Sequence, residues 1–234
     1  MTAVLPGRHG GPSKLDDCLV HGSGSGAELF IVEGDSAAAA VARVRDARTQ
    51  AVLPMQGKPL NAARASRERV LEHPFFGPLA AALNAGIEAD CDPARSRYDR
   101  VLVLTDPDAD GIHCGFLVLL FCHRWLRPLL DLGRVHLVRP PWGEVVVGGE
   151  LRLAFSEPEL TTLATRCRSG GGEVRRFRGL AALDADVLRE TCVDPATRRV
   201  EQVSAAAVAA MIQVIAAVQP EERGPPEAGS MRGW

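Results

Sequence analysis

Three aspartates at alternate positions are the residues of this sequence best suited to chemistry. Asp106, Asp108 and Asp110 follow an apolar, β-branched run at residues 101–103 and precede a glycine and a long apolar segment. Carboxylates this close together repel one another, and a divalent cation relieves the repulsion. Hard cations such as Mg²⁺ prefer oxygen ligands. The pattern therefore predicts a metal site at the carboxyl end of a strand, where open α/β folds bind their ligands.

A second acidic turn follows another apolar run. Residues 28–32 read Glu-Leu-Phe-Ile-Val, and Glu33-Gly34-Asp35-Ser36 comes next. The glycine permits a tight turn, and Asp35 or Ser36 can cap a following helix. If the two strands are neighbours in a parallel sheet, Glu33 and the aspartates converge.

Three other interpretations of the aspartates are less consistent with the sequence. An EF-hand loop needs a bidentate Glu at its twelfth position, which here is Leu117. A phosphatase of the haloacid-dehalogenase type would not explain the acidic turn at Glu33. Helix capping alone needs one aspartate, not three and a distant Glu.

Strands and helices alternate along the predicted core, which indicates βαβ units and a mainly parallel sheet covered by helices on both faces. The expected strands are 29–33, 51–53, 101–105 and 135–138. The expected helices are 36–48, 65–72, 78–85 and 111–130, the last of which kinks or ends near Pro128. Beyond the core, residues 150–178 predict strand, short helix and loop, with a flexible turn at 169–172. Residues 185–190 predict a short helix, and apolar residues at helical spacing predict a last helix around 208–218.

The two acidic turns resemble those of a Toprim domain. Their amino-acid sequences resemble motifs of the B-subunit family of bacterial DNA gyrase and topoisomerase IV. Further segments resemble motifs of that family in the same order, from Leu5 to Val203. They are Leu5–Gly7, Lys14–Cys18, Gln50–Asn61, Val135–Pro141, Arg176–Leu180 and Thr191–Arg199. The resemblance implies a Rossmann-like Toprim α/β core with a small C-terminal tail region. The expected domains are a flexible N-terminal arm at 1–26, the Toprim domain at 27–145, the tail region at 146–222 and a disordered tail at 223–234.

The resemblance also implies an activity, the metal-binding DNA-cleavage part of a type IIA topoisomerase. Glu33 would assist proton transfer at the scissile phosphate and share Mg²⁺, or Mn²⁺, with Asp106, Asp108 and Asp110. Gly57, Lys58 and Arg178 are expected to contact DNA. His113 matches a histidine often found in the family. Two roles stay open for it: a residue packed in the core or a residue that orients the site. Tyr98 is the only tyrosine of the chain. It is expected to be structural, because the family's nucleophilic tyrosine belongs to the A subunit.

The departures from the family favour an alternative, a catalytically impaired topoisomerase paralogue that acts as a DNA- or subunit-binding modulator. The intact Glu33 and aspartates oppose this alternative. Alanines stand at 38, 39 and 42 in place of small glycines and a lysine, and Gly115 replaces an arginine. Residues 181–183 read Ala-Ala-Leu where the family has Gly-Glu-Met. No nucleotide-binding motif or transducer pattern is found. We therefore expect no ATP site in this chain, and ATP hydrolysis would need a separate subunit.

Composition is consistent with these expectations. The formal net charge of −2 over 234 residues argues against a protein that is cationic throughout, although arginines cluster locally. Six cysteines without a Cys-x-x-Cys pair fit a reducing cytoplasm, with Cys114 and Cys122 expected in the core. No secretory signal or membrane-spanning run is present. The expected partners are DNA and an A-type subunit in the bacterial cytoplasm, near the nucleoid, with no membrane.

Overall fold

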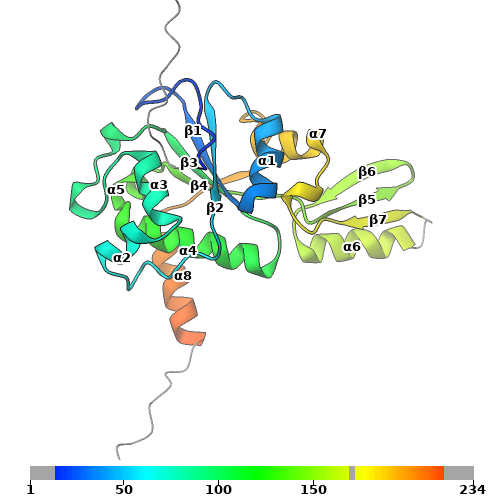
Figure 1. Ribbon diagram of the computed structural model, residues 1–234. Helices are drawn as coiled ribbons and strands as arrows, with labels where there is room; N and C mark the ends of the chain where they lie inside the picture. The colour runs from blue at the N-terminus through cyan, green and yellow to red at the C-terminus, as the bar shows by residue number, and fades with distance from the viewer. Residues whose placement is uncertain (1–13, 169–171, 219–234) are drawn as a thin grey trace, which may run out of the picture.

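The computed structural model describes residues 14–168 and 172–218 and shows two sheets of different size (Figure 1). The elements of the first half are β1 (Glu28–Glu33), α1 (Gly34–Val44), β2 (Gln50–Met55), α2 (Arg67–Glu72), α3 (Phe76–Leu83), the 3₁₀ turns η1 (Glu88–Asp90) and η2 (Pro93–Arg95), β3 (Arg100–Leu104) and α4 (Ala109–Trp125). Those of the second half are α5 (Arg127–Asp131), β4 (Val135–Val138), β5 (Gly143–Val147), β6 (Glu150–Ala154), α6 (Glu157–Arg168), β7 (Glu173–Arg176), η3 (Leu180–Ala182), α7 (Ala185–Leu188), the π-helical turn η4 (Arg189–Val193), β8 (Val200–Gln202) and α8 (Ala205–Val218).

The larger sheet has the strand order β2-β1-β3-β4-β8. Its first four strands are parallel, and β8 alone runs antiparallel, beside β4. All four strands predicted for the core are present, within two residues of the expected bounds at each end. The predicted α/β class, a mainly parallel sheet with helices on both faces, is confirmed.

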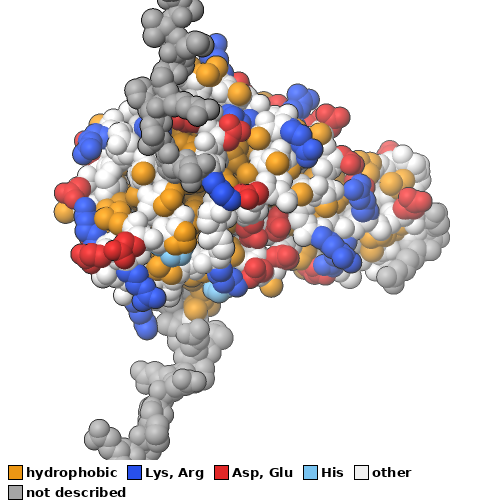
Figure 2. Space-filling model, viewed as in Figure 1, with side chains coloured by type: hydrophobic (Ala, Val, Ile, Leu, Met, Phe, Trp, Pro, Cys, Tyr) orange, Lys and Arg blue, Asp and Glu red, His pale blue; other side chains and the backbone are white. Residues whose placement is uncertain are grey.

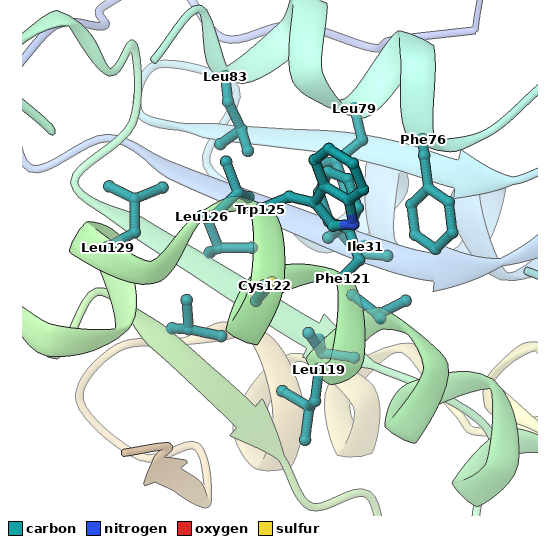
Figure 3. Packing of buried hydrophobic residues seen from close by; sticks show 14 of the residues in the cluster. Ile31, Phe76, Leu79, Leu83, Leu119, Phe121, Cys122, Trp125, Leu126 and Leu129 are labelled. Carbon is teal, nitrogen blue, oxygen red and sulfur yellow. The ribbon is translucent and has the colours of Figure 1, made fainter. Parts of the chain in front are cut away.

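Alternate residues of β1 face two different hydrophobic layers. Leu29 and Ile31 belong to the core beneath α3 and α4, whereas Phe30 and Val32 belong to the core beneath α1 and α7. In the first layer α4 carries Phe121 and Trp125, which pack with residues of α3 against the sheet (Figure 3). A strand buried on both faces reads as a continuous apolar run, which explains why no polar alternation marks β1 in the sequence.

The smaller sheet has the order β6-β5-β7 and carries α6 on one face. It projects from the side of the larger sheet where α1 and α7 lie (Figure 1). The sequence interpretation missed β5, although three valines followed by Gly148-Gly149 and a second apolar segment are typical of a β-hairpin. The domain boundary expected between residues 145 and 146 lies inside this strand.

The segment after the smaller sheet returns to the larger one. Leu180, Leu188 and Val193 are buried in the same layer as Phe30 and Val32. Farther along, β8 extends the larger sheet and α8 packs on α4 and α5. Part of the tail region expected at 146–222 therefore completes the core of the larger sheet.

Two of the expected helices differ from the structure in a way that their side chains explain. The helix predicted at 36–48 ends at Val44, because Arg45 adopts an extended backbone and its guanidinium binds the carbonyl oxygen of Gln50 and the carboxylate of Asp16. The helix predicted at 111–130 is divided into α4 and α5, since Pro128 lacks the N–H that a continuous helix would need. This division agrees with the kink expected near Pro128.

The described part of the expected N-terminal arm is held against the domain. Asp16 exchanges two backbone hydrogen bonds with Val52 of β2, and Cys18 is buried. The rest of that arm, most of the turn expected at 169–172 and the tail expected at 223–234 lie outside the described residues. All six cysteines are buried and unpaired, including Cys114 and Cys122 as expected. Within residues 14–168 and 172–218, no helix is long and apolar enough to cross a membrane.

Candidate active site at the ends of β1 and β3

The two acidic turns lie next to each other because β1 and β3 are adjacent parallel strands. Val32 is paired with Leu104 in the sheet register, so Glu33 and the turn that starts at Thr105 leave the sheet at the same edge. The convergence that the sequence predicted depends on this pairing. Figure 2 shows acidic side chains gathered near the centre of this face, close to the smaller sheet.

Glu33 is the most perturbed carboxyl group at this edge. Burial, reinforced by the negative charges of Asp106, Asp108 and Asp110, raises the pKa of Glu33 to about 7. Its Oε1 atom is buried and has no hydrogen-bond partner. A buried carboxylate oxygen without a donor is costly, and a cation is one means of compensating for it.

The first turn of α4 lies directly over Glu33. A Cβ atom added at Gly111 would come within 2.8 Å of Glu33 Oε1 and 2.2 Å of the carbonyl oxygen of Asp106. Only glycine allows this approach without movement of the backbone. The glycine after the third aspartate is therefore needed for close packing of α4 on the site.

The three aspartates have different environments. Asp106 is partly buried and accepts a hydrogen bond from the backbone N–H of Leu180 at 2.8 Å. Burial raises its pKa, with the charge of Asp108 adding to the effect and the Leu180 hydrogen bond opposing it. Asp108 is exposed and caps α4 by accepting from the N–H of Gly111 at 2.8 Å.

Asp110 forms an ion pair with Lys58, whose Nζ lies 2.5 Å from Asp110 Oδ1. This hydrogen bond and the charge of Lys58 hold the pKa of Asp110 below its usual range. Lys58 follows Gly57, which has a φ of 70° and so takes a conformation that favours glycine. The structure thus brings Lys58 to the acidic edge, where it neutralises one of the four carboxylates.

The oxygen ligands that Glu33, Asp106, Asp108 and Asp110 offer are of the type that a hard divalent cation prefers. The four side chains offer only carboxylate oxygens, and the one buried and unpartnered oxygen belongs to Glu33. Asp106, Asp108 and Asp110 each have a partner within the protein. The described residues contain no cluster of three or more His, Cys, Asp or Glu side chains in a metal-binding arrangement.

The other expected site residues lie at different distances from the acidic edge. His113 is exposed on α4. Of the two roles that the sequence left open for it, the packed core residue is therefore wrong. Arg178 is exposed in the segment before η3, two residues from the Leu180 amide that binds Asp106.

Tyr98 lies away from the acidic edge. It precedes β3, whereas Asp106 follows it, so the two residues are at opposite ends of the strand. Its side chain is buried and its hydroxyl donates to Asp17 at 2.7 Å. Burial and this hydrogen bond raise the pKa of Tyr98, which makes the phenol a poor nucleophile. The expected structural role of Tyr98 agrees with these contacts.

Comparison with known proteins agrees with the fold. Residues 28–140 match the family model of the Toprim domain. The chain contains a Toprim domain. The chain is also similar to the B subunit of DNA gyrase from Archaeoglobus fulgidus, with 38% identity over 193 residues. Similar matches are the gyrase B subunit of Thermotoga maritima, with 37% identity over 194 residues, and a novobiocin-resistant gyrase B subunit of Streptomyces niveus, with 38% identity over 209 residues.

These matches cover most of the present chain but a smaller part of the relatives. They include 82%, 82% and 87% of this chain, respectively, and 30% of each relative. The chain therefore spans about 30% of the length of the gyrase proteins that it matches. The Toprim match and the similarity to gyrase B together identify a Toprim-containing, gyrase B-like chain.

One contact at the Toprim site could not be inferred from local sequence. The Leu180 amide lies 74 residues beyond Asp106. In the sequence, only the Arg-Gly-Leu motif of the tail region indicated that this segment is part of the site.

Proposed function

We propose that this chain is the metal-binding, DNA-cleaving part of a type IIA topoisomerase and acts with an A-type subunit on DNA. The observation that carries the proposal is the buried, unpartnered oxygen of Glu33 beside three aspartates at one sheet edge. Glu33, Asp106 and Asp108 would hold Mg²⁺ or Mn²⁺, with Asp110 in support. When bound, the cation would supply positive charge to the oxygens exchanged during phosphoryl transfer.

Glu33 is suited to hold or release a proton near the scissile phosphate. A carboxyl group with a pKa near 7 can take either form at neutral pH, which general acid–base chemistry needs. Lys58 and Arg178 would contact DNA phosphates, and the backbone at Gly57 would let Lys58 approach. Binding of DNA or of a cation would then compete with the ion pair between Lys58 and Asp110.

The nucleophilic tyrosine would come from the A-type subunit, since Tyr98 is buried and bonded to Asp17. ATP hydrolysis, where the reaction needs it, would come from a separate module or subunit. The same proposal places the chain in the cytoplasm with DNA as its substrate.

A second candidate is a paralogue that binds DNA or an A-type partner without cleaving. The specific observation in its favour is at Gly115, where a Cβ atom would meet Thr105 Oγ1 at 3.3 Å. The arginine of the family would need Thr105 to move, so this side of the site differs from the family pattern.

Cation binding is the first test. Calorimetric titration with Mg²⁺ and Mn²⁺ should show binding to the full chain, and the double substitution Asp106→Ala with Asp108→Ala should abolish it. A matched control, Asp186→Ala with Glu190→Ala, removes two exposed carboxylates outside the site and should bind normally. Equal binding by the site variant and the wild type would refute the assignment of the site.

Cleavage with a matching A-type subunit is the second test. Plasmid DNA should be cut only with the divalent cation, and the covalent adduct should form on the A-type subunit. Glu33→Ala should abolish cleavage while co-purification with the partner persists. Co-purification without any cleavage by the wild type would instead support the non-cleaving paralogue.

A further inference from the structure

The segment that leaves β7 reaches back to the acidic edge of the larger sheet. β7 ends at Arg176, and the next residues, 177–179, cross to the end of β3, where η3 begins at Leu180. The segment contacts Asp106, which belongs to a different part of the chain. The contact joins the smaller sheet to one of the proposed cation ligands.

This segment lies against both oxygens of the Asp106 carboxylate. The N–H of Leu180 donates to Asp106 Oδ1 at 2.8 Å. A Cβ atom added at Gly179 would lie 2.7 Å from Asp106 Oδ2 and 3.2 Å from Oδ1. Gly179 has a φ of 166°, which any residue adopts, so space and not backbone conformation requires glycine here.

The segment is fixed on both sides by buried side chains. Phe177 and Leu180 are 4% and 0% exposed, and both pack in the core layer that contains Phe30 and Leu104. The N–H of Phe177 also donates to the carbonyl oxygen of Trp142 at 3.0 Å. Because both ends of the segment are held, the amide of Leu180 is presented in a fixed direction.

We propose that Gly179 and Leu180 are positioning residues that orient the Asp106 carboxylate for a divalent cation. The N–H of Leu180 binds Asp106 Oδ1. Because Gly179 has no side chain, Asp106 Oδ2 is not displaced from its position. Carboxylates that bind metals are commonly oriented by hydrogen bonds of this kind. The inference rests on the proposed function, because it assigns Asp106 to a cation.

The substitution Gly179→Ala tests the inference in the full chain. The added Cβ atom would push the carboxylate away from its present direction. We expect Mn²⁺ and Mg²⁺ affinity, measured by calorimetry, to fall by about tenfold to a hundredfold, the usual effect of losing an outer partner of a ligand. Circular dichroism should show that the variant is folded at the temperature of the titration.

Gly172→Ala is the matched control. A Cβ atom there would clash with the carbonyl oxygen of Val146, so it disturbs the far end of the smaller sheet but touches neither Asp106 nor the hydrogen bond between Phe177 and Trp142. We expect this control to lose stability and keep its cation affinity. Equal loss of affinity in both variants would show that general disturbance of the smaller sheet is responsible, and it would overturn the inference.

A double-mutant cycle separates the contact from the proposed function and remains informative without a cation. Asp106→Ala removes the carboxylate that the new Cβ atom would meet, so Gly179→Ala should destabilise this background less than the wild type in urea denaturation. Wild-type cation affinity in a folded Gly179→Ala variant would overturn the positioning inference and leave the proposed function standing. A wild type that binds no cation would refute the proposed function and the positioning of Asp106 for a cation. If the double-mutant cycle still shows that the two substitutions are coupled in stability, the contact between Gly179 and Asp106 itself is supported.

Discussion

Removal of the Arg198 guanidinium should destabilise the fold more than any other single charge removal that we consider. Arg198 lies in the tail motif after η4, and Glu28 is the first residue of β1. Arg198 Nη1 and Nη2 lie 2.7 and 2.5 Å from the two carboxylate oxygens of Glu28, and the side chains are only 2% and 5% exposed. Gln50 Nε2 donates to the same carboxylate at 2.9 Å, and Arg100 Nη1 lies 3.2 Å from it.

The magnitude follows from what remains around Glu28. Removing one partner of a buried ion pair costs about 3–5 kcal/mol, since the other charge stays buried. In Arg198→Met, Gln50 and the half-exposed Arg100 still stabilise the carboxylate, so we expect a loss at the lower end, ~3 kcal/mol. For a chain of this size, that loss lowers Tm by roughly 6–12 °C.

The same pair makes stability depend on pH. Burial alone would raise the pKa of Glu28, but the hydrogen bonds from Arg198 and Gln50 outweigh it and hold that pKa below its usual range. A carboxyl group with a lowered pKa in the folded state stabilises the fold above its unfolded pKa, and this contribution is lost as the pH falls through the folded pKa. We therefore expect the acid-side loss of stability to become shallower in Arg198→Met.

Urea denaturation followed by circular dichroism at pH 7, and again at several values below pH 5, measures both effects. Arg189→Met is the matched control, because Arg189 is an exposed arginine at the start of η4, shortly before that motif. The double variant Glu28→Gln with Arg198→Met should recover much of the lost stability, since no unpaired charge remains buried. A loss below about 0.5 kcal/mol in Arg198→Met, the usual range for exposed sites, would refute the reasoning.

Three further substitutions give distinct outcomes. Tyr98→Phe should lower the free energy of unfolding by about 1 kcal/mol, because the buried hydrogen bond to Asp17 is lost, and it should leave Mn²⁺ binding unchanged in calorimetry. Asp108→Ala should lower the free energy of unfolding by about 1 kcal/mol, because the cap of α4 is lost, and it should also weaken cation binding. Asp108→Asn should keep the cap and weaken only cation binding. Lys58→Met removes an exposed ion pair and should leave thermal unfolding unchanged, while the salt dependence of DNA binding loses about one unit of slope. Unchanged salt dependence in that variant would exclude Lys58 from the phosphate contacts.

The sequence by itself determined the four parallel strands of the larger sheet and the identity of the acidic residues. Apolar runs of the right length with glycine turns identify β1 and β3 because a buried parallel strand leaves few alternatives for such a run. The motifs at Glu33 and Asp106 carried the resemblance to Toprim domains, which the family match confirms.

Only the tertiary structure decided which groups surround those acids. The ion pair of Lys58 with Asp110 and the amide of Leu180 on Asp106 join segments 52 and 74 residues apart. Local propensity contains no information about such contacts, because they depend on how separate elements pack. The same reason explains why β8, with three exposed residues, and the buried partner of Glu28 could not be read from the chain. The raised pKa of Glu33 likewise results from burial under α4, and burial is a property of the assembled fold.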